Sequence, residues 1–235
     1  MHKEPHQAPG RRILVIVGND RNDQGVMALA RAALRGAISA GCYGNVRFLP
    51  EIIPDVLTRC GSCDGESPCR IRDGLYDFIQ RNVLRADGII FCSRLYWHGY
   101  SKCMEAFLDR SVCYHRFEGA RAGQSNRRRR RTPMAMSLLL EEASSTCLND
   151  LDYKMMDYAR NMGGVLNGIT VSNASSGLPG MERDHSAALR GVEGMARELL
   201  FYDPRHFDMR CIDCPPVDTD PRHTFGAWGS LTDIH

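Results

Sequence analysis

Five short apolar runs alternate with segments of helical periodicity along most of this chain. Short apolar runs of this kind are typical of strands in a parallel sheet, where helices cover both faces and bury the strands completely. No repeat at a fixed spacing competes with this interpretation. The sequence therefore predicts an α/β fold with strands at 13–17, 45–49, 88–92, 133–140 and 164–171.

Helices are expected between these strands, because apolar residues there recur at the spacing of one helix face. Between residues 73 and 86, for example, Leu75, Phe78 and Ile79 share a face, and Asp73 is placed to cap the helix at its N-terminus. The expected helices span 25–40, 73–86, 101–116, 148–162 and 183–202.

One domain over residues 12–202 accounts for this continuous pattern. Residues 1–11 are polar and contain proline, so we expect a flexible leader there. Residues 203–235 show little periodicity, and we expect a C-terminal extension that docks on the domain or on a dimer partner.

The composition limits the class of partner. A net charge of +2 is too small for a nucleic-acid-binding polyelectrolyte, and no apolar run reaches the ~18 residues of a membrane span. The polar N-terminus also lacks the apolar segment of a signal peptide. We therefore expect a cytoplasmic protein that binds neither nucleic acid nor membrane. The run Arg127–Arg131 is expected to be a mobile loop or a lid that attracts a phosphate group of a ligand.

Ligands of open parallel sheets bind at the carboxyl ends of the strands, which selects loops 18–25, 93–100 and 141–147. The first loop leads into a helix N-terminus, whose free amides and dipole suit a phosphate. Arg21 adds positive charge, and Gly18 and Gly25 permit close approach of the backbone. Neither a dinucleotide-binding nor a P-loop motif is present.

The segment "SRLYWHG" at 93–99, followed by "SKCMEAFLDR", is the most specific feature. Together with the first loop and a cysteine-bearing loop after the second strand, it resembles the NADPH-dependent FMN reductase branch of the flavodoxin-like proteins, which includes the iron–sulfur flavoproteins. The likeness covers about residues 12–172. It implies a flavodoxin-like three-layer sandwich with a five-stranded parallel sheet in the order 2-1-3-4-5, and a homodimer or homotetramer.

The resemblance also implies a cofactor and a reaction. FMN would accept hydride from NADPH or NADH at flavin N5 and pass it to a small-molecule electron acceptor: a quinone, a flavin, a nitro or azo compound, or a biosynthetic intermediate. Tyr96 and His98 are the best-placed proton sources. The residues implied to bind FMN are Asn19, Arg21, Gln24, Gly25, Val26, Ser93, Leu95, Tyr96, Trp97, His98, Gly99 and Ser144.

Some residues depart from the family pattern. Asn19 and Asp20 stand where the family usually has Ser and Pro, and Asp20 and Asp23 bring negative charge to the phosphate loop. Arg94 replaces the usual proline and His98 a usual glycine, which puts bulk and positive charge beside the ring.

The loop "CGSCDGESPC" contains Cys60, Cys63 and Cys69. An iron–sulfur cluster normally takes four thiolates, and the iron–sulfur flavoproteins carry a cysteine where Glu66 stands here. We therefore predict no metal, with a site at these three cysteines as the weaker alternative. The corresponding alternative function is an iron–sulfur flavoprotein or flavodoxin-type electron carrier with a protein partner. A third alternative is a flavin-free binding or regulatory protein, because the first loop lacks the hydroxyl donors to phosphate that are usual in the family.

Overall fold

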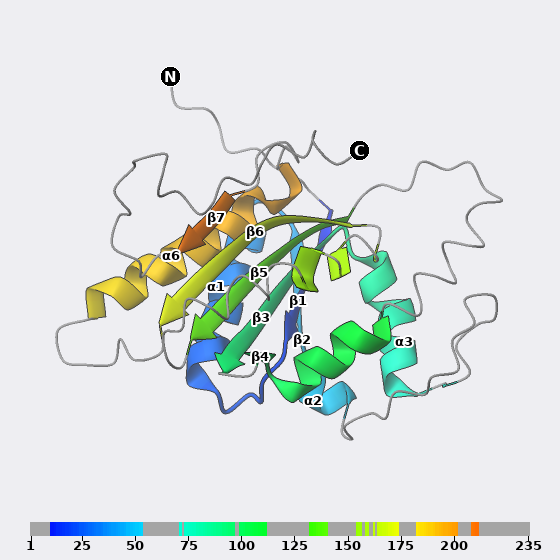
Figure 1. Cartoon of the computed structure of the whole chain (residues 1–235). Helices are drawn as coiled ribbons and strands as arrows, with labels where there is room; N and C mark the ends of the chain where they lie inside the picture. The colour runs from blue at the N-terminus through cyan, green and yellow to red at the C-terminus, as the bar shows by residue number, and fades with distance from the viewer. Residues whose placement is uncertain are drawn as a thin grey trace, which may run out of the picture.

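The computed structural model describes residues 10–53, 71, 73–96, 99–111, 132–140, 154–156, 158–159, 162, 164–173, 182–201 and 208–211. A twisted sheet forms the centre of the molecule, with parallel strands in the order β2-β1-β3-β5-β6-β7 (Figure 1). These strands are β1 (Arg12–Val17), β2 (Tyr43–Phe48), β3 (Gly88–Tyr96), β5 (Thr132–Leu140), β6 (Gly164–Asn173) and β7 (Asp208–Cys211).

The predicted α/β fold is confirmed, since the five expected strands occur in the expected order. Two strands were not predicted. β4 (Gly99–Tyr100) pairs antiparallel with β3, and β7, from the C-terminal extension, pairs parallel with β6. The boundaries of the domain at residues 12 and 202 stay predictions.

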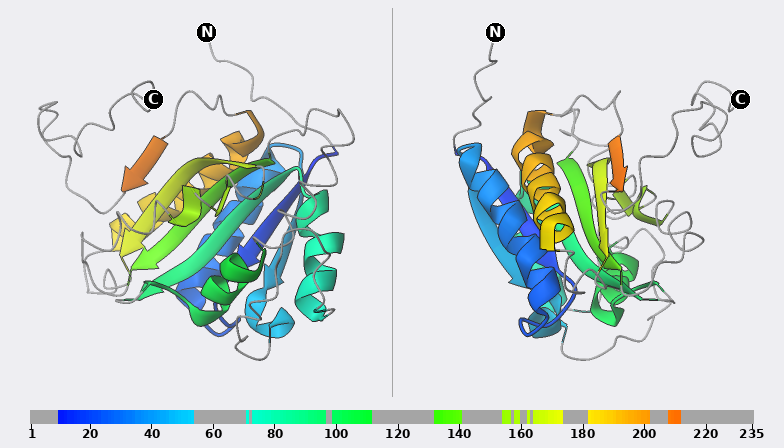
Figure 2. Two further views of the ribbon diagram at one scale, coloured as in Figure 1. Left: turned by 45° about the vertical axis from the view of Figure 1, so that its right-hand side comes forward. Right: turned by 90° about the vertical axis from the view of Figure 1, so that its left-hand side faces the viewer.

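Helices cover both faces of the sheet (Figure 2). One face carries α1 (Gln24–Ser39) and α6 (Glu182–Glu198), followed by the 3₁₀ turn η3 (Leu199–Phe201). The other face carries α3 (Gly74–Arg81), the turn η1 (Val83–Arg85) and the helical residues 102–111, while the short α2 (Leu49–Ile52) follows β2. The predicted cap is confirmed, because the Asp73 carboxylate accepts a hydrogen bond from the Tyr76 amide at 3.0 Å.

Helices α1 and α6 touch at a glycine. A methyl group added to Gly36 would lie 2.1 Å from the carbonyl oxygen of Glu193 and 2.9 Å from the Ala196 Cβ. The missing side chain therefore sets the distance between the two helices that cover this face.

Gly36→Ala is expected to destabilise the domain by about 1–3 kcal/mol, because a backbone carbonyl must move to admit the methyl group. Gly194→Ala, in α6, is the matched control, since a Cβ there meets no atom within 4 Å. This control should be neutral or stabilising by up to about 1 kcal/mol through helix propensity. Urea unfolding of both variants checks the prediction, and equal effects would contradict it.

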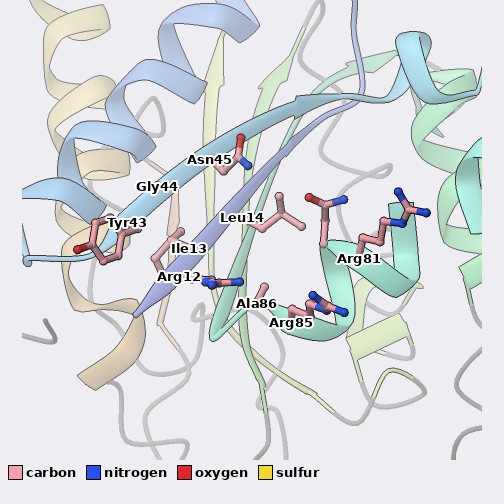
Figure 3. Close-up of a pocket in the computed structure, with 10 residues that line it drawn as sticks. Arg12, Ile13, Leu14, Tyr43, Gly44, Asn45, Arg81, Arg85 and Ala86 are labelled. Atoms are coloured by element: carbon pink, nitrogen blue, oxygen red, sulfur yellow. The ribbon is translucent and has the colours of Figure 1, made fainter. Parts of the chain in front are cut away.

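Part of strand β2 is exposed on the face of the sheet opposite α1. Side chains alternate along the strand: Gly44 and Val46 face α1, so Tyr43 and Asn45 lie on the other face, where they are exposed. A cleft of about 300 Å³ lies there, between the amino ends of β1 and β2 and the end of α3 (Figure 3). Its charged lining residues are Arg12, Arg81 and Arg85.

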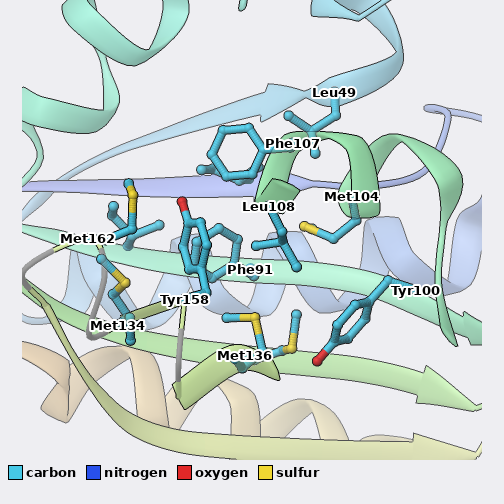
Figure 4. Packing of buried hydrophobic residues seen from close by; sticks show 14 of the residues in the cluster. Leu49, Phe91, Tyr100, Met104, Phe107, Leu108, Met134, Met136, Tyr158 and Met162 are labelled. Carbon is cyan, nitrogen blue, oxygen red and sulfur yellow. The ribbon is translucent and has the colours of Figure 1, made fainter. Parts of the chain in front are cut away.

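Further along the same face, aromatic and methionine side chains fill the core (Figure 4). Phe91 of β3 lies edge-on to Tyr158, with ring centroids 5.6 Å apart, and Phe107 lies 6.2 Å from Phe91 and 6.1 Å from Phe78. This packing anchors β3, and with it the segment that follows, to the helical residues 102–111.

The described cysteines are consistent with packing roles. Cys42 and Cys92 are buried, and burial raises the pKa of the Cys92 thiol to about 12, so it stays protonated and unreactive. Among the described residues, no helix has the length and apolar composition that crossing a membrane would require.

Candidate functional site

Strand β3 continues through the segment that was predicted to be a loop. Residues Ser93 to Leu95 pair in parallel with Leu138 to Leu140 of β5, and the chain then returns as β4, with Tyr96 opposite Gly99. The prediction of a loop starting at residue 93 was therefore wrong. The candidate site is built on a β-hairpin at the carboxyl end of β3, because pairing with β5 extends the strand.

Gly18, after β1, brings the first loop against this hairpin. The Ser101 hydroxyl donates to the Gly18 carbonyl at 2.6 Å. A Cβ on Gly18 would lie 2.6 Å from the Ser101 Oγ and 2.9 Å from the Ser93 Oγ. Only glycine fits this position, and the two loops are consequently in direct contact.

Asn19 ties the first loop to the hairpin. Its Oδ1 accepts a hydrogen bond from the Arg94 backbone amide at 2.9 Å, and its Nδ2 donates to the Tyr96 hydroxyl at 3.2 Å. The side chain is buried, with 8% of the residue exposed. Asn19 therefore uses its side-chain amide to hold the first loop against the hairpin. The sequence analysis had assigned Asn19 to FMN binding.

Asp23 caps helix α1, whose N-terminus lies beside the end of β3. Its Oδ1 accepts a hydrogen bond from the Val26 amide at 3.2 Å. The Arg94 guanidinium donates to the same carboxylate twice, from Nε to Oδ2 at 2.9 Å and from Nη2 to Oδ1 at 2.8 Å. The side chains of Arg94 and Asp23 are 19% and 12% exposed, so the pair is largely shielded from solvent.

Strand alternation explains why Arg94 reaches α1. Ile90 and Cys92 belong to the core beneath α1, and Arg94, two residues further along β3, projects to the same face. Gly25 of α1 lies against the neighbouring strand, where a Cβ would meet the Leu139 side chain at 2.4 Å. The sequence analysis missed this ion pair because it ended the strand at Cys92, although the helix-capping position of Asp23 was recognisable from the sequence.

The Asp23 carboxylate is held in its ionised form. Burial alone would raise its pKa, but the hydrogen bonds from Arg94 and from the amides of Val26 and Gly25, with the Arg94 charge, outweigh burial and place the pKa below the usual range. The N-terminus of α1 therefore already carries a bound negative charge.

Arg21 is engaged elsewhere. Its guanidinium pairs with Glu51 of α2 through Nε to Oε1 and through Nη2 to Oε2, the latter at 3.0 Å, and its Cζ lies 4.3 Å from the centroid of the Phe48 ring. The Arg21 side chain is 64% exposed. The arginine at the helix N-terminus is thus Arg94, whereas Arg21 must leave Glu51 to reach a ligand there.

The tip of the hairpin combines an exposed tyrosine and a glycine with a positive φ. Tyr96 is 39% exposed. Gly99 has a φ of +129°, and a Cβ there would lie 2.5 Å from the Glu105 Oε1. The positive φ therefore favours glycine here, independently of any ligand.

The other predicted residues divide into three groups. Val26, Ser93 and Leu95 are buried and expose almost no surface to a ligand, while Gln24 is exposed at the start of α1. Trp97, His98 and Ser144 lie outside the described residues, as do Cys60, Cys63, Cys69 and Arg127–Arg131. Within the described ranges, no cluster of three metal-binding side chains occurs.

Comparison with known proteins identifies the family. The family model described as NADPH-dependent FMN reductase matches residues 11–136, which is more than half of the chain and includes both loops of the site. The chain belongs to the NADPH-dependent FMN reductase family. This family binds FMN, uses NADPH as its reductant and consists of oxidoreductases.

Solved structures agree with this fold. The NAD(P)H:quinone oxidoreductase from Methanothermobacter marburgensis has a TM-score of 0.57 at 14% identity, over 81% of this chain and 97% of that one. An azoreductase from Bacillus anthracis has a TM-score of 0.54 at 12% identity, over 80% of this chain and 99% of that one. A search of curated proteins found no match.

In this FMN reductase family member, the backbone at the carboxyl edge of the sheet is arranged in a way that fits FMN. The α1 N-terminus and the β3–β4 hairpin lie side by side at the carboxyl edge of the sheet, and Tyr96 is exposed there. The phosphate end fits less well, because the carboxylate of Asp23 already occupies the Val26 amide. The arginine-lined cleft of Figure 3 lies at the opposite, amino ends of β1 and β2, so we do not assign the cofactor to it.

Proposed function

We propose that this protein is an FMN-dependent NAD(P)H oxidoreductase that transfers hydride from NADPH or NADH to a small organic acceptor. The observation that carries this proposal is the family match over residues 11–136, which contains both loops that Asn19 joins at the carboxyl edge of the sheet. When bound, FMN supplies hydride transfer through its N5 position. The protein supplies position, hydrogen bonds and exclusion of water.

We propose two groups of binding residues. Asn19, Arg21, Gln24, Gly25 and Val26 would surround the phosphate end of FMN. The hairpin would face the ring, with contributions from Ser93, Leu95, Tyr96, Trp97, His98 and Gly99, and with Ser144 completing the site.

A quinone or an azo compound is the acceptor class that we favour. The names of the structural relatives, a quinone oxidoreductase and an azoreductase, motivate this choice, although their sequence identity supports the fold alone. A homodimer or homotetramer in the cytoplasm completes the proposal. The weaker alternative of a metal at Cys60, Cys63 and Cys69 lies outside the described residues.

The test is NADPH consumption by the purified protein. After incubation with FMN and removal of unbound flavin, the protein should be yellow and should oxidise NADPH when a quinone or azo compound is added. Iron analysis of anaerobically purified protein separates this function from an iron–sulfur electron carrier. A protein that binds flavin but oxidises neither NADPH nor NADH with any of these acceptors would contradict the proposal.

Tyr96 and His98 are the proposed proton-donating side chains. The Tyr96 hydroxyl accepts a hydrogen bond from the Asn19 Nδ2, so its own proton remains to be donated to a ligand.

We expect Tyr96→Phe to lower kcat for quinone reduction about tenfold, because a hydrogen bond to a group that gains charge is lost while the ring is retained. Tyr43→Phe is the control, since Tyr43 is 71% exposed at the amino end of β2. Steady-state kinetics at saturating NADPH compares the two variants. Unchanged kcat in Tyr96→Phe would remove the hydroxyl from the mechanism.

A further inference from the structure

The phosphate end of the site contains an ion pair that belongs to the protein itself. We propose that Asp23 selects against the phosphate of FMN by occupying the amides at the N-terminus of α1 and by holding Arg94. This inference rests on the proposed function, since it concerns the ligand preference of the same site. It predicts that the phosphate adds little to flavin affinity in the wild-type protein.

The geometry gives the first step. A phosphate at a helix N-terminus is bound by first-turn amides that have no partner within the helix. Here the Val26 amide donates to the Asp23 Oδ1 at 3.2 Å, and the Gly25 amide also interacts with this carboxylate. A phosphate oxygen can use these donors only if Asp23 moves away from them.

Charge gives the second step. A phosphate that replaced Asp23 on the amides would lie beside a carboxylate with the same sign of charge. With only 12% of the Asp23 side chain exposed, solvent would screen this repulsion poorly. The pKa of Asp23 lies below its usual range, because Arg94 and the amides outweigh burial, so protonation does not remove the charge near neutral pH.

Arg94 gives the third step. Its guanidinium lies beside the first turn of α1, with Nη2 3.8 Å from a Cβ placed on Gly25, yet two of its donors are committed to Asp23 at 2.9 and 2.8 Å. Binding a phosphate through Arg94 therefore requires breaking a bidentate, largely buried pair. Arg21 is likewise held by Glu51. In the wild-type protein, an existing ion pair must therefore break before either arginine can bind a phosphate.

Asp23→Asn tests this role with little structural change. An asparagine oxygen still caps α1 through the Val26 amide in the absence of ligand, because Asn and Asp are equally good capping residues. Its bond to the amide is neutral and weaker than that of a carboxylate, so a phosphate oxygen can displace it more easily. The variant removes the negative charge and releases Arg94 to interact with phosphate. Asp20→Asn is the matched control: it removes the same charge from the same loop, but Asp20 is exposed and is not the capping residue of α1.

The experiment titrates each protein with FMN and with riboflavin, which lacks the phosphate. Quenching of the flavin fluorescence measures binding. We expect Asp23→Asn to tighten FMN binding about tenfold to a hundredfold, the value of one or two charge-assisted contacts. Riboflavin affinity should stay within about twofold. Asp20→Asn should leave both affinities near those of wild type. Adding Arg94→Gln to Asp23→Asn should abolish most of the gain for FMN.

Each outcome decides the proposal. An unchanged ratio of FMN to riboflavin affinity in Asp23→Asn would overturn it, because the pair would then rearrange at no cost. An equal gain in Asp20→Asn would also overturn it, by showing a general charge effect. If neither flavin binds any of these folded proteins, the proposed function fails as well. If both bind and only the phosphate preference is unaltered, the proposed function stands and this inference alone fails.

Discussion

Asn19→Ala is expected to lower kcat/KM for NADPH-dependent quinone reduction about a hundredfold while the domain remains folded. The substitution removes the acceptor of the Arg94 amide and the donor to the Tyr96 hydroxyl, two of the bonds that hold the first loop against the hairpin. Loss of a hydrogen bond to a partly buried amide costs about 1–3 kcal/mol. Displacement of reacting groups by about 1 Å is sufficient for a loss of this size.

Asn45→Ala is the matched control for this variant. Asn45 is exposed on β2 and lines the cleft at the amino end of the sheet, away from the hairpin. Steady-state kinetics and thermal unfolding of both variants check the prediction. If Asn19→Ala retained wild-type kcat/KM, the link through Asn19 would be irrelevant to turnover, and pairing with β5, the Arg94–Asp23 ion pair and the Ser101–Gly18 hydrogen bond would be sufficient to position the hairpin.

The order of the strands was predictable because it depends on local patterns. Runs such as 13–17 and 88–92 are apolar on both faces, as parallel strands between two helix layers must be. The start of α1 and the cap at Asp73 were likewise close to the predicted positions, since helix capping is decided by a few neighbouring residues.

The end of β3 was not predictable in this way. Ser93 and Arg94 are polar, and they continue the strand because Leu138 and Leu139 of β5 provide pairing partners. Those partners are distant in sequence, so their effect is invisible to local periodicity. The short strand β7 was missed for the same reason, because its four residues form a strand by pairing with β6.

The candidate site shows the same division. The edge of the sheet and the two loops followed from topology, and the family match agrees with them. The ion-pair partners of Arg21 and Arg94 did not follow from topology, because the sequence offers each arginine several carboxylates. Arg94 pairs with Asp23 because of the face of β3 on which it lies, whereas Arg21, in the loop after β1, pairs with Glu51 of α2. Sequence analysis assigned the phosphate to Arg21, whereas the structure brings Arg94 to the helix N-terminus.

Asp73→Ala is expected to lower the free energy of unfolding by about 2–4 kcal/mol at pH 7. The Asp73 carboxylate caps α3 and also accepts hydrogen bonds from Arg110, at 2.5 Å to Oδ2 and 3.1 Å to Oδ1. Loss of a cap costs about 0.5–2 kcal/mol. The Arg110 side chain is only 11% exposed and would lose its carboxylate partner, which adds a cost below that of a fully buried pair because Asp73 is 34% exposed.

The effect should depend on pH in a direction that the pKa of Asp73 determines. Burial alone would raise this pKa, but Arg110 and the Tyr76 amide outweigh burial and lower it. The unfolded chain therefore binds the proton more tightly than the folded domain does. The stabilisation is complete above the unfolded pKa of about 3.9 and is lost as the pH falls through the lower folded value.

Asp73→Asn isolates this charge, since asparagine keeps the cap on α3 but removes the ion pair. We expect the difference in unfolding free energy between wild type and Asp73→Asn to be constant from about pH 7 to pH 5 and to shrink below about pH 4. Asp77→Asn is the control, because Asp77 is 62% exposed and lies 3.9 Å from an exposed Arg81, so its effect should stay within about 0.5 kcal/mol. Urea unfolding at several pH values provides the measurement. A difference that persisted undiminished at pH 3 would show that the Asp73 carboxylate does not stabilise the domain through its charge.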